Sequence, residues 1–340
     1  MPSFITAQVP LAPYTTLGVG GLAEFFAFVE TVSELHDAVA WAQAQGHAIT
    51  VLGGGSNVLV SEEGVRGLVI HLVLHAVTYV HDGDSVRVTA EAGTVLDTLI
   101  EELVAKGLWG LENLSHIPGT VGAVPVQNVG AYGVEAKEVI AEVTVYDCEC
   151  NEIQILTNAE CAFAYRDSIF KRREGARYIV TAVTFIVSSV PAPHLTYKDI
   201  TDYFGSRCNP TLREIRDAII EIRSTKLPDW HTIGTAGSFF KNPIVSSVVF
   251  ATLRAQYPEL PGYPEENGNI KISLGWILDK VCGLRGYREG NVGLYEKQAL
   301  VLVCQKGSTA HEVEQYAEKI VTLVKDRTGI AIELEVRMLK

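Results

Sequence analysis

VLGGGSNVLV at residues 51–60 is the stretch that decides the fold. Two short apolar runs flank three consecutive glycines, and Ser56 and Asn57 follow the glycines directly. Glycines let the backbone turn sharply and expose successive N–H groups, which can cradle a pyrophosphate. The three glycines alone favour a plain turn between two strands slightly over a pyrophosphate-binding loop. The motifs G-x-G-x-x-G and G-x-x-x-x-G-K-[ST] are absent, so a dinucleotide would be bound on something other than a Rossmann fold.

Helical and strand patterns alternate on both sides of this loop. Apolar periodicity predicts strands at 48–52, 67–72, 85–90, 143–147 and 178–187, with a final strand at 329–339. Helices are predicted at 33–46, 94–106, from 211 onward, 273–282 and 310–327. Capping boxes are expected for Thr94 with Asp97 and for Thr211 with Glu214, and Gly46 suits a helix C-terminus. The mixture predicts an α+β protein of two or three domains.

Two segments break the rhythm. Residues 115–133 hold four Gly and two Pro and show neither helical nor alternating character, and residues 231–243 form another irregular segment that contains glycine. Long irregular segments inside an apolar chain are usually functional. The prolines at 191, 193 and 210 indicate a domain boundary in that region.

Composition excludes several classes of function. The 340 residues carry 28 Lys and Arg against 40 Asp and Glu, so the net charge is −12, and nucleic acid is not an expected partner. An anionic substrate would need locally placed Lys or Arg. No apolar run approaches the roughly 18 residues of a membrane helix, and the N-terminus does not resemble a signal peptide.

The cysteines favour a cytoplasmic protein with reduced thiols. No C-x-x-C pair exists, so zinc spacing is absent. Cys148 and Cys150 would point to the same face of a strand, where a disulfide is awkward. Buried reduced thiols are expected for all six cysteines, Cys148, Cys150, Cys161, Cys208, Cys282 and Cys304.

A set of motifs in fixed order carries a family resemblance. VLGGGSNVLV at 51–60 is followed by IPGTVGAVPVQNVGAYG at 117–133, AYRDSIFK at 164–171, TKLPD at 225–229, GTAGSFFKNP at 234–243 and ELEVR at 333–337. Together they closely resemble the UDP-N-acetylenolpyruvoylglucosamine reductase (MurB) family, from about Tyr14 to Arg337.

The resemblance implies a fold of the vanillyl-alcohol-oxidase type that holds FAD. It implies a first FAD subdomain at 1–70 with the terminal strand 329–340, a second at 71–207, and a substrate domain at 211–328. Ser56 and Asn57 stand where oxidases that tether FAD often have a histidine, so non-covalent FAD is expected. The implied FAD contacts are Gly53, Gly54, Gly55, Ser56, Asn57, Pro118, Gly119, Thr120, Gly122, Gln127, Asn128, Gly130, Ala131, Tyr132 and Gly133.

The implied reaction is the NADPH-dependent reduction of UDP-N-acetylglucosamine enolpyruvate in peptidoglycan precursor synthesis. Ser238 matches the proton donor, Arg166 the arginine that pairs with the substrate carboxylate, and Glu335 a carboxyl group near the reacting carbon. Without the resemblance, Arg166 reads as an ion-pair partner of Asp167, Ser238 as a turn hydroxyl and Glu335 as a half-exposed strand carboxylate.

UDP-sugar contacts are implied for Lys226, Lys241, Asn242 and Tyr197, the last in LTYKDI at 195–200, which resembles the longer form of the family. This chain departs from the family at Leu334, where proline is common, and at Arg285, where lysine is expected. His71 and His75 lack an acidic ligand cluster and are expected to be solvated or core residues, so no metal is expected.

Two other functions compete with this interpretation. One is another FAD oxidoreductase of the same fold, which would not need Ser238 as a proton donor to a carbanion. The other is a non-enzymatic UDP-sugar-binding protein, against which the glycine loop and the three catalytic matches argue.

Overall fold

The computed structural model describes residues 1–207, 209–265 and 267–340, so Cys208 lies outside the described residues. The chain forms two compact units, and each is described by itself. The first unit comprises Met1–Val9, Ala23–Gly55 and Arg66–Arg223. The second comprises Pro10–Leu22, Ser56–Val65 and Ser224–Lys340.

A four-stranded sheet and one helix build the first core of the first unit. The strand order is β1 (Ile5–Pro10), β2 (Leu22–Val29), β5 (Val65–Leu72) and β3 (Ile49–Leu52). Helix α1 (Val32–Gln45) packs its apolar stripe into this core. It begins at a capping box formed by Thr31 and Glu34 and ends at Gly46, whose φ is 71°. The predicted helix and its glycine end are therefore confirmed.

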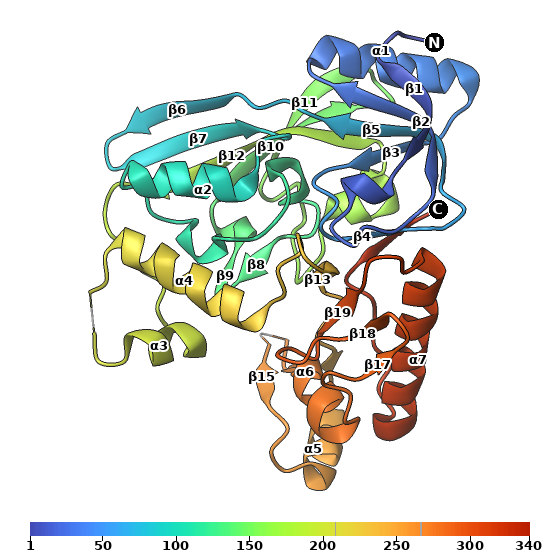
Figure 1. Ribbon diagram of the computed structural model, residues 1–340. Helices are drawn as coiled ribbons and strands as arrows, with labels where there is room; N and C mark the ends of the chain where they lie inside the picture. The colour runs from blue at the N-terminus through green and yellow to red at the C-terminus, as the bar shows by residue number, and fades with distance from the viewer. Residues whose placement is uncertain (208, 266) are drawn as a thin grey trace. The chain divides into compact units, whose positions relative to one another are not determined.

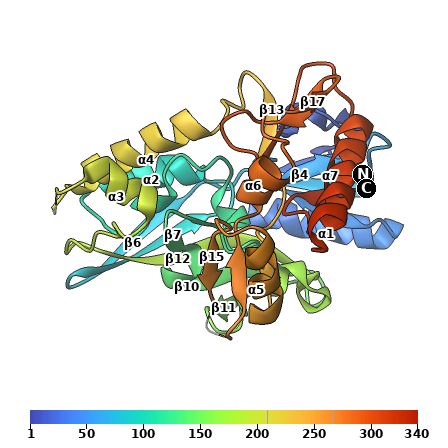
Figure 2. The ribbon, with the colours of Figure 1, turned by 90° about the horizontal axis from the view of Figure 1, so that it is seen from below.

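A five-stranded antiparallel sheet builds the second core of the same unit. Its order is β11 (Glu152–Thr157), β10 (Ile140–Asp147), β12 (Tyr178–Ser188), β7 (Ser85–Glu91) and β6 (Val77–Asp82). Helices α2 (Leu96–Ala105) and α4 (Leu212–Lys226) lie side by side along it (Figures 1 and 2), and both contribute to the apolar cluster on that sheet. Helix α3 (Lys198–Phe204) adds Ile200 to the same cluster.

One predicted capping box is confirmed and the other is wrong. Glu214 and Thr211 cap α4 reciprocally, with the Glu214 N–H donating to the Thr211 hydroxyl at 3.3 Å. Helix α2 has Val95 at its N-cap and no side-chain cap. The Asp97 carboxylate instead accepts two hydrogen bonds from Arg216, at 2.6 and 3.1 Å. The Asp97 carboxylate binds Arg216 instead of capping the helix, because a bidentate, partly buried ion pair is stronger than a hydrogen bond to a neutral cap.

The boundary between the units also differs from the expected one. The apolar face of α4, including Ile215 and Ile219, belongs to the core of the first unit. The chain therefore passes into the second unit after Arg223 rather than at 211. Residues 56–65, expected within the first FAD subdomain, belong to the second unit. The assignment of the two cores to two FAD subdomains stays a prediction.

The second unit combines small sheets and helices around one core. Its four-stranded sheet runs β13 (Gly234–Ser238), β19 (Val301–Cys304), β18 (Val292–Leu294) and β17 (Arg288–Glu289). A smaller sheet runs β14 (Ile244–Val245), β16 (Ile270–Ile272) and β15 (Gly262–Pro264). Helices α5 (Ser247–Gln256), α6 (Leu274–Trp276) and α7 (Ala310–Thr328) complete the unit, and a π-helical turn at Ile277–Val281 continues α6.

The expected terminal strand at 329–339 is much shorter. Strand β20 covers only Arg337–Leu339 and pairs in parallel with β4 (Val58–Val60). Upstream, the chain meets residues 239–241 through a single bridge between Phe240 and Leu334. That pairing cannot extend far because Pro243 has no N–H to donate.

Other expectations were also corrected. The irregular segment expected at 231–243 contains β13. Cys148 and Cys150 follow β10 in a turn rather than in a strand, and Cys150 is exposed. Cys161 and Cys304 are buried free thiols as expected, whereas Cys148 and Cys282 are half-buried.

The described residues hold no group of three or more potential metal ligands. None of the helices in the described part of the chain is long and apolar enough to span a membrane.

Candidate functional site

The glycine loop is not a hairpin turn. Strand β3 before it pairs with β5, whereas β4 after it pairs with β20 in a different sheet. Within the first unit, a Cβ on Gly53 would lie 2.8 Å from the Thr120 hydroxyl, and one on Gly54 would lie 2.8 Å from the Gly119 Cα. Real Cβ atoms essentially never approach so closely, so both glycines are required by the way this loop meets segment 117–133.

The two segments that meet there present backbone donors. Within the described part of the chain, the N–H groups of Gly54, Gly119 and Thr120 donate to no other group of the protein. Gly119 has φ = 122°, a conformation open to glycine and rarely to other residues. Unused backbone N–H groups on neighbouring glycine-rich segments can bind phosphate oxygens. The arrangement therefore fits the pyrophosphate of a dinucleotide such as FAD.

A buried asparagine secures the middle of segment 117–133. Asn128 is fully buried with φ = 44°, and its amide donates to the Glu135 carboxylate and to the Ala164 carbonyl, both at 3.0 Å. Its Oδ1 accepts from the Lys137 N–H. The Asn128 side chain therefore binds the protein itself, and its predicted contact with FAD stays a prediction.

Arg166 lies at the tip of a tight turn that points it at this segment. The Ala164 and Asp167 backbones bond to each other across the turn, and Arg166 has a left-handed φ of 52°. Its guanidinium donates to the Gly130 carbonyl at 2.8 Å and to the Asn128 carbonyl at 3.5 Å. Asp167 is instead paired with Arg172 at 2.8 Å. The predicted pair of Arg166 with Asp167 is thus wrong. A residue with strained backbone that contacts a glycine-rich segment is typical of a functional position.

Ser238 stands at the end of β13, directly after an irregularity in the ladder. The pairing of β13 with β19 shifts register between Thr235 and Ser238, and Gly237 has φ = 71°. Such bulges re-aim the side chains that follow them and are frequent beside active sites. Ser238 is half-buried. The simple role of a turn hydroxyl does not explain why the strand breaks at this point.

Glu335 lies on the neighbouring extended segment of the second unit. Its N–H donates to the carbonyl of Phe239, the residue after Ser238, at 2.9 Å. The Asn57 amide donates to the Glu335 carbonyl at 3.3 Å, and the Asn57 carbonyl accepts from the Arg337 N–H at 3.0 Å. The structure thus brings Ser238 and Glu335 onto adjacent segments and fixes Glu335 to the end of the glycine loop.

The predicted UDP-sugar residues occupy different settings. Tyr197 is the N-cap residue of α3, is exposed, and packs edge-on against Tyr132 with ring centroids 5.4 Å apart. Lys226 ends α4. Lys241 pairs with Glu333 at 2.9 Å, and the Asn242 side chain accepts from the Leu274 N–H at the start of α6. Arg285 pairs with Asp279 at 3.3 Å.

Two residues that shape segment 117–133 were missed in the sequence. Asn113 is buried and donates to the carbonyls of Tyr132 and His194, at 2.9 and 3.0 Å, so it ties the Tyr197 loop to the glycine-rich segment. Arg223 bonds the His116 carbonyl at 3.1 Å and the Tyr132 hydroxyl. Burial raises the pKa of Tyr132 to about 12, so this phenol stays protonated. Asn113 follows an apolar run in the sequence, and this is the only local feature that could have indicated its buried position.

His71 is half-buried and His75 is exposed. The Nδ1 of His71 lies 3.0 Å from the Leu52 carbonyl and its ring stacks on Phe26. Burial lowers the pKa of His71, which favours the neutral ring.

Comparison with known proteins agrees with this arrangement. An FAD-binding domain model matches residues 23–154, and the model of the UDP-N-acetylenolpyruvoylglucosamine reductase C-terminal domain matches residues 228–339. With the glycine loop described above, these matches define an FAD-dependent oxidoreductase of α+β fold.

Relatives identify the particular family. The chain is 40% identical to a UDP-N-acetylenolpyruvoylglucosamine reductase of Pseudomonas putida, over 96% of this chain and 97% of the relative. It is 39% identical to the protein of that name from Neisseria meningitidis serogroup A, over 97% and 96%. The crystal structure of the MurB reductase from Thermus caldophilus superposes with a TM-score of 0.69 at 27% identity, covering 99% of this chain and all of that one. The chain belongs to the UDP-N-acetylenolpyruvoylglucosamine reductase family.

Proposed function

We propose that this protein reduces UDP-N-acetylglucosamine enolpyruvate to UDP-N-acetylmuramate, with NADPH as the reductant, in peptidoglycan precursor synthesis. The observation that carries the proposal is that Ser238 and Glu335 lie on neighbouring segments of the second unit. The two residues lie on adjacent segments joined by the hydrogen bond from the Glu335 N–H to the Phe239 carbonyl. Family membership supplies the substrate.

The glycine residues at 53–55 and 119 and the backbone donors beside them would hold the FAD pyrophosphate. The loop has no tethering histidine, so we propose that FAD is bound non-covalently. FAD, when bound, supplies the hydride after its reduction by NADPH. The other predicted FAD contacts from Ser56 to Gly133 remain proposals.

Three side chains would carry the polar chemistry. Hydride addition to the alkene leaves negative charge on the carbon next to the carboxylate, and this charge spreads into the carboxylate. The Arg166 guanidinium would pair with that carboxylate, for which its planar fork is suited. Ser238 would donate its hydroxyl proton to the carbon, and Glu335 would stabilise the same enolate-like charge.

Locally placed polar groups would bind the UDP moiety of a chain whose net charge is −12. Lys226, Lys241, Asn242 and Tyr197 are proposed for this role. Lys241 is only 27% exposed and is held by Glu333, so its position is restricted before substrate arrives. The cytoplasmic location expected from the sequence stays a prediction.

Steady-state oxidation of NADPH tests the proposal. The purified protein should oxidise NADPH rapidly only when UDP-N-acetylglucosamine enolpyruvate is present, and UDP-N-acetylmuramate should accumulate in equal amount. Rapid oxidation without that substrate, with oxygen as the acceptor, would support an oxidase of the same fold instead. A colourless protein that binds the UDP-sugar without turnover would support the binding-protein alternative.

A further inference from the structure

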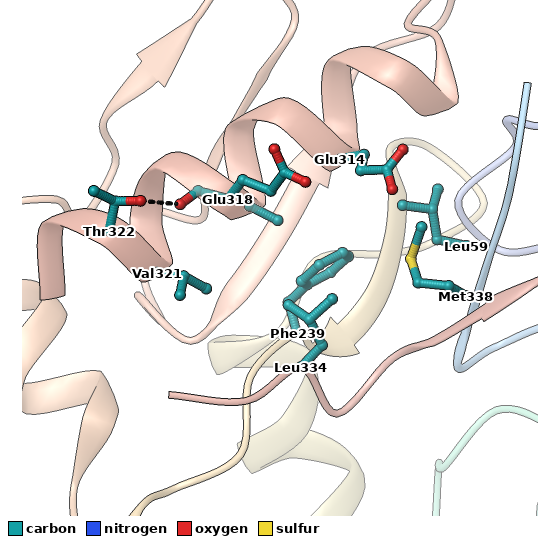
Figure 3. A pocket seen from close by; sticks show the side chains of 9 residues that line it. Leu59, Phe239, Glu314, Glu318, Val321, Thr322, Leu334 and Met338 are labelled. Atoms are coloured by element: carbon teal, nitrogen blue, oxygen red, sulfur yellow. Dashed lines mark hydrogen bonds between the residues drawn. The ribbon is translucent and has the colours of Figure 1, made fainter. Parts of the chain in front are cut away.

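A groove on the second unit is not used by the proposed reaction. It has a volume of about 380 Å³ and lies between α7 and the C-terminal segment. Figure 3 shows Phe239, Leu334 and Met338 on the side that faces α7. The complete lining is Leu59, Phe239, Glu314, Ala317, Glu318, Val321, Thr322, Leu334 and Met338. The volume is at the lower end of the range for small-molecule sites.

The charged groups of this groove are all of one sign. Glu314 and Glu318 stand one helical turn apart on α7, where like charges destabilise a helix. The Glu314 carboxylate already holds a cation, the Lys340 ammonium at 3.1 Å. Among the described residues, no Lys or Arg pairs with Glu318 within 4.0 Å. A second cation at Glu318 would relieve the repulsion.

We propose that this groove, which we call the α7 groove, binds a small amphiphilic cation. The apolar walls would take a hydrocarbon or aromatic body, and the Glu318 carboxylate would take a single ammonium group. Leu334 supplies part of the wall at the position where the family commonly has proline. An anionic ligand of the same shape would be repelled by the Glu318 carboxylate, which pairs with no Lys or Arg among the described residues.

The groove is connected to the catalytic segments through its floor. Phe239 and Leu334 directly adjoin Ser238 and Glu335 in the chain, and the Phe239 carbonyl accepts the Glu335 N–H. An occupant would therefore alter turnover without competing with the UDP-sugar. This consequence rests on the proposed function, whereas binding itself is measured without turnover, so the two can fail separately.

Calorimetric titration of the purified protein with 4-phenylbutylammonium and with 4-phenylbutanoate tests the site. The amine should bind, less tightly as salt rises, and the acid should not. Glu318→Gln should weaken binding of the amine about two- to fivefold, as expected for one exposed charge contact. Asp326→Asn, which removes an exposed charge of α7 outside the groove, should leave the affinity unchanged.

Leu334→Pro tests the apolar wall without disturbing the fold. The local pairing uses the N–H groups of Lys241 and Glu335, so proline at 334 removes no hydrogen bond. This variant should bind the amine more weakly and keep the wild-type circular dichroism spectrum. Absence of amine binding up to its solubility limit, equal binding of the acid, or equal effects of Glu318→Gln and Asp326→Asn would each overturn the proposal.

Discussion

The proposed role of Ser238 requires a weak acid to be held in position by its surroundings. A serine hydroxyl can protonate a carbon only when the carbon is strongly basic and the hydroxyl is already in place. The register shift beside Gly237 and the hydrogen bond from the Phe239 N–H to the Leu300 carbonyl fix the backbone on both sides of Ser238. The position of the hydroxyl therefore follows from the strand rather than from a side-chain network.

Ser238→Ala should separate the two half-reactions. Flavin reduction by NADPH needs no proton from Ser238 and should keep its rate. Reoxidation by the enolpyruvyl substrate should slow by roughly 10²- to 10⁴-fold, the usual cost of losing a positioned acid. Stopped-flow spectroscopy measures both steps, with Ser247→Ala, an exposed serine of α5, as the matched control. Equal slowing of both steps would make Ser238 structural.

Asn57→Ala tests how Glu335 is positioned. The variant loses the hydrogen bond from the Asn57 amide to the Glu335 carbonyl but keeps the backbone bond to Arg337. One hydrogen bond contributes about 1 kcal/mol, so reoxidation should slow about fivefold in protein saturated with FAD. Reduction by NADPH under the same conditions should be unchanged. If the variant changed only the affinity for FAD, the proposed role of Asn57 in positioning Glu335 would be contradicted.

The residues that sequence could predict are those that sit in motifs. Ser238, Arg166 and Glu335 stand in short segments that resemble the family, so each could be proposed for a catalytic role from the sequence, and those roles stay predictions. Asn113 and Arg223 could not, because their partners are carbonyls up to 107 residues away in the chain. The Arg166–Asp167 alternative failed for the same reason, since Arg172 takes the carboxylate.

At the scale of elements, local sequence patterns predicted a helix cap correctly where no residue distant in the chain binds the capping side chain. Thr211 and Glu214 cap α4 as predicted, and the nearby Arg207 binds the same Glu214 carboxylate without displacing the cap. Asp97 does not cap α2, because Arg216 from α4 binds it across 119 residues. The length of the terminal strand was overestimated. Apolar alternation at 330–336 reflects burial in the core of the second unit, whereas strand pairing is confined to Arg337–Leu339.

Arg216→Ala should show what the contact between α2 and α4 contributes. Arg216 is almost fully buried, so its removal leaves the Asp97 carboxylate short of its partner. Loss of one member of a buried pair costs about 3 kcal/mol of unfolding free energy. Arg213→Ala breaks an exposed pair with Asp217 on the same helix and should cost less than about 0.5 kcal/mol. Urea denaturation at pH 7 measures the free energy of unfolding of both variants and of the wild type.

The same pair predicts a dependence on pH. Burial alone would raise the pKa of Asp97, but hydrogen bonds from Arg216 and from the His116 N–H hold that pKa below its usual value. A lowered carboxylate pKa stabilises the fold above about pH 3.9, the value in the unfolded chain, and the effect is lost as the pH falls through the folded pKa. The difference between wild type and Arg216→Ala should therefore shrink in acid. A constant difference would contradict this assignment.

Gly54→Ala tests the contact between the glycine loop and segment 117–133. The added Cβ would meet the Gly119 backbone at 2.8 Å, so one of the two segments must move. The flavin content of the purified variant should fall well below that of wild type, as read from visible absorbance. Gly46→Ala changes a left-handed glycine in open space and should keep its flavin. Full flavin content in Gly54→Ala would show that the loop does not hold the cofactor.

At the scale of the whole molecule, the chain combines an acidic surface with an anionic substrate. The net charge of −12 makes long-range attraction of UDP unfavourable, so we expect binding to depend on a few local cations. Composition could predict this need, and the family motifs supplied the candidates. The division into units could not be read from composition, because residues 10–22 and 56–65 leave the N-terminal part of the chain to join a C-terminal core.

Anaerobic mixing of the reduced protein with UDP-N-acetylglucosamine enolpyruvate tests the central claim most directly. The protein is first reduced with one equivalent of NADPH until the yellow colour of its flavin is lost. Addition of the enolpyruvyl substrate should restore the colour within a single turnover and form one UDP-N-acetylmuramate for each flavin reoxidised. A flavin that stays reduced until oxygen is admitted would contradict the account.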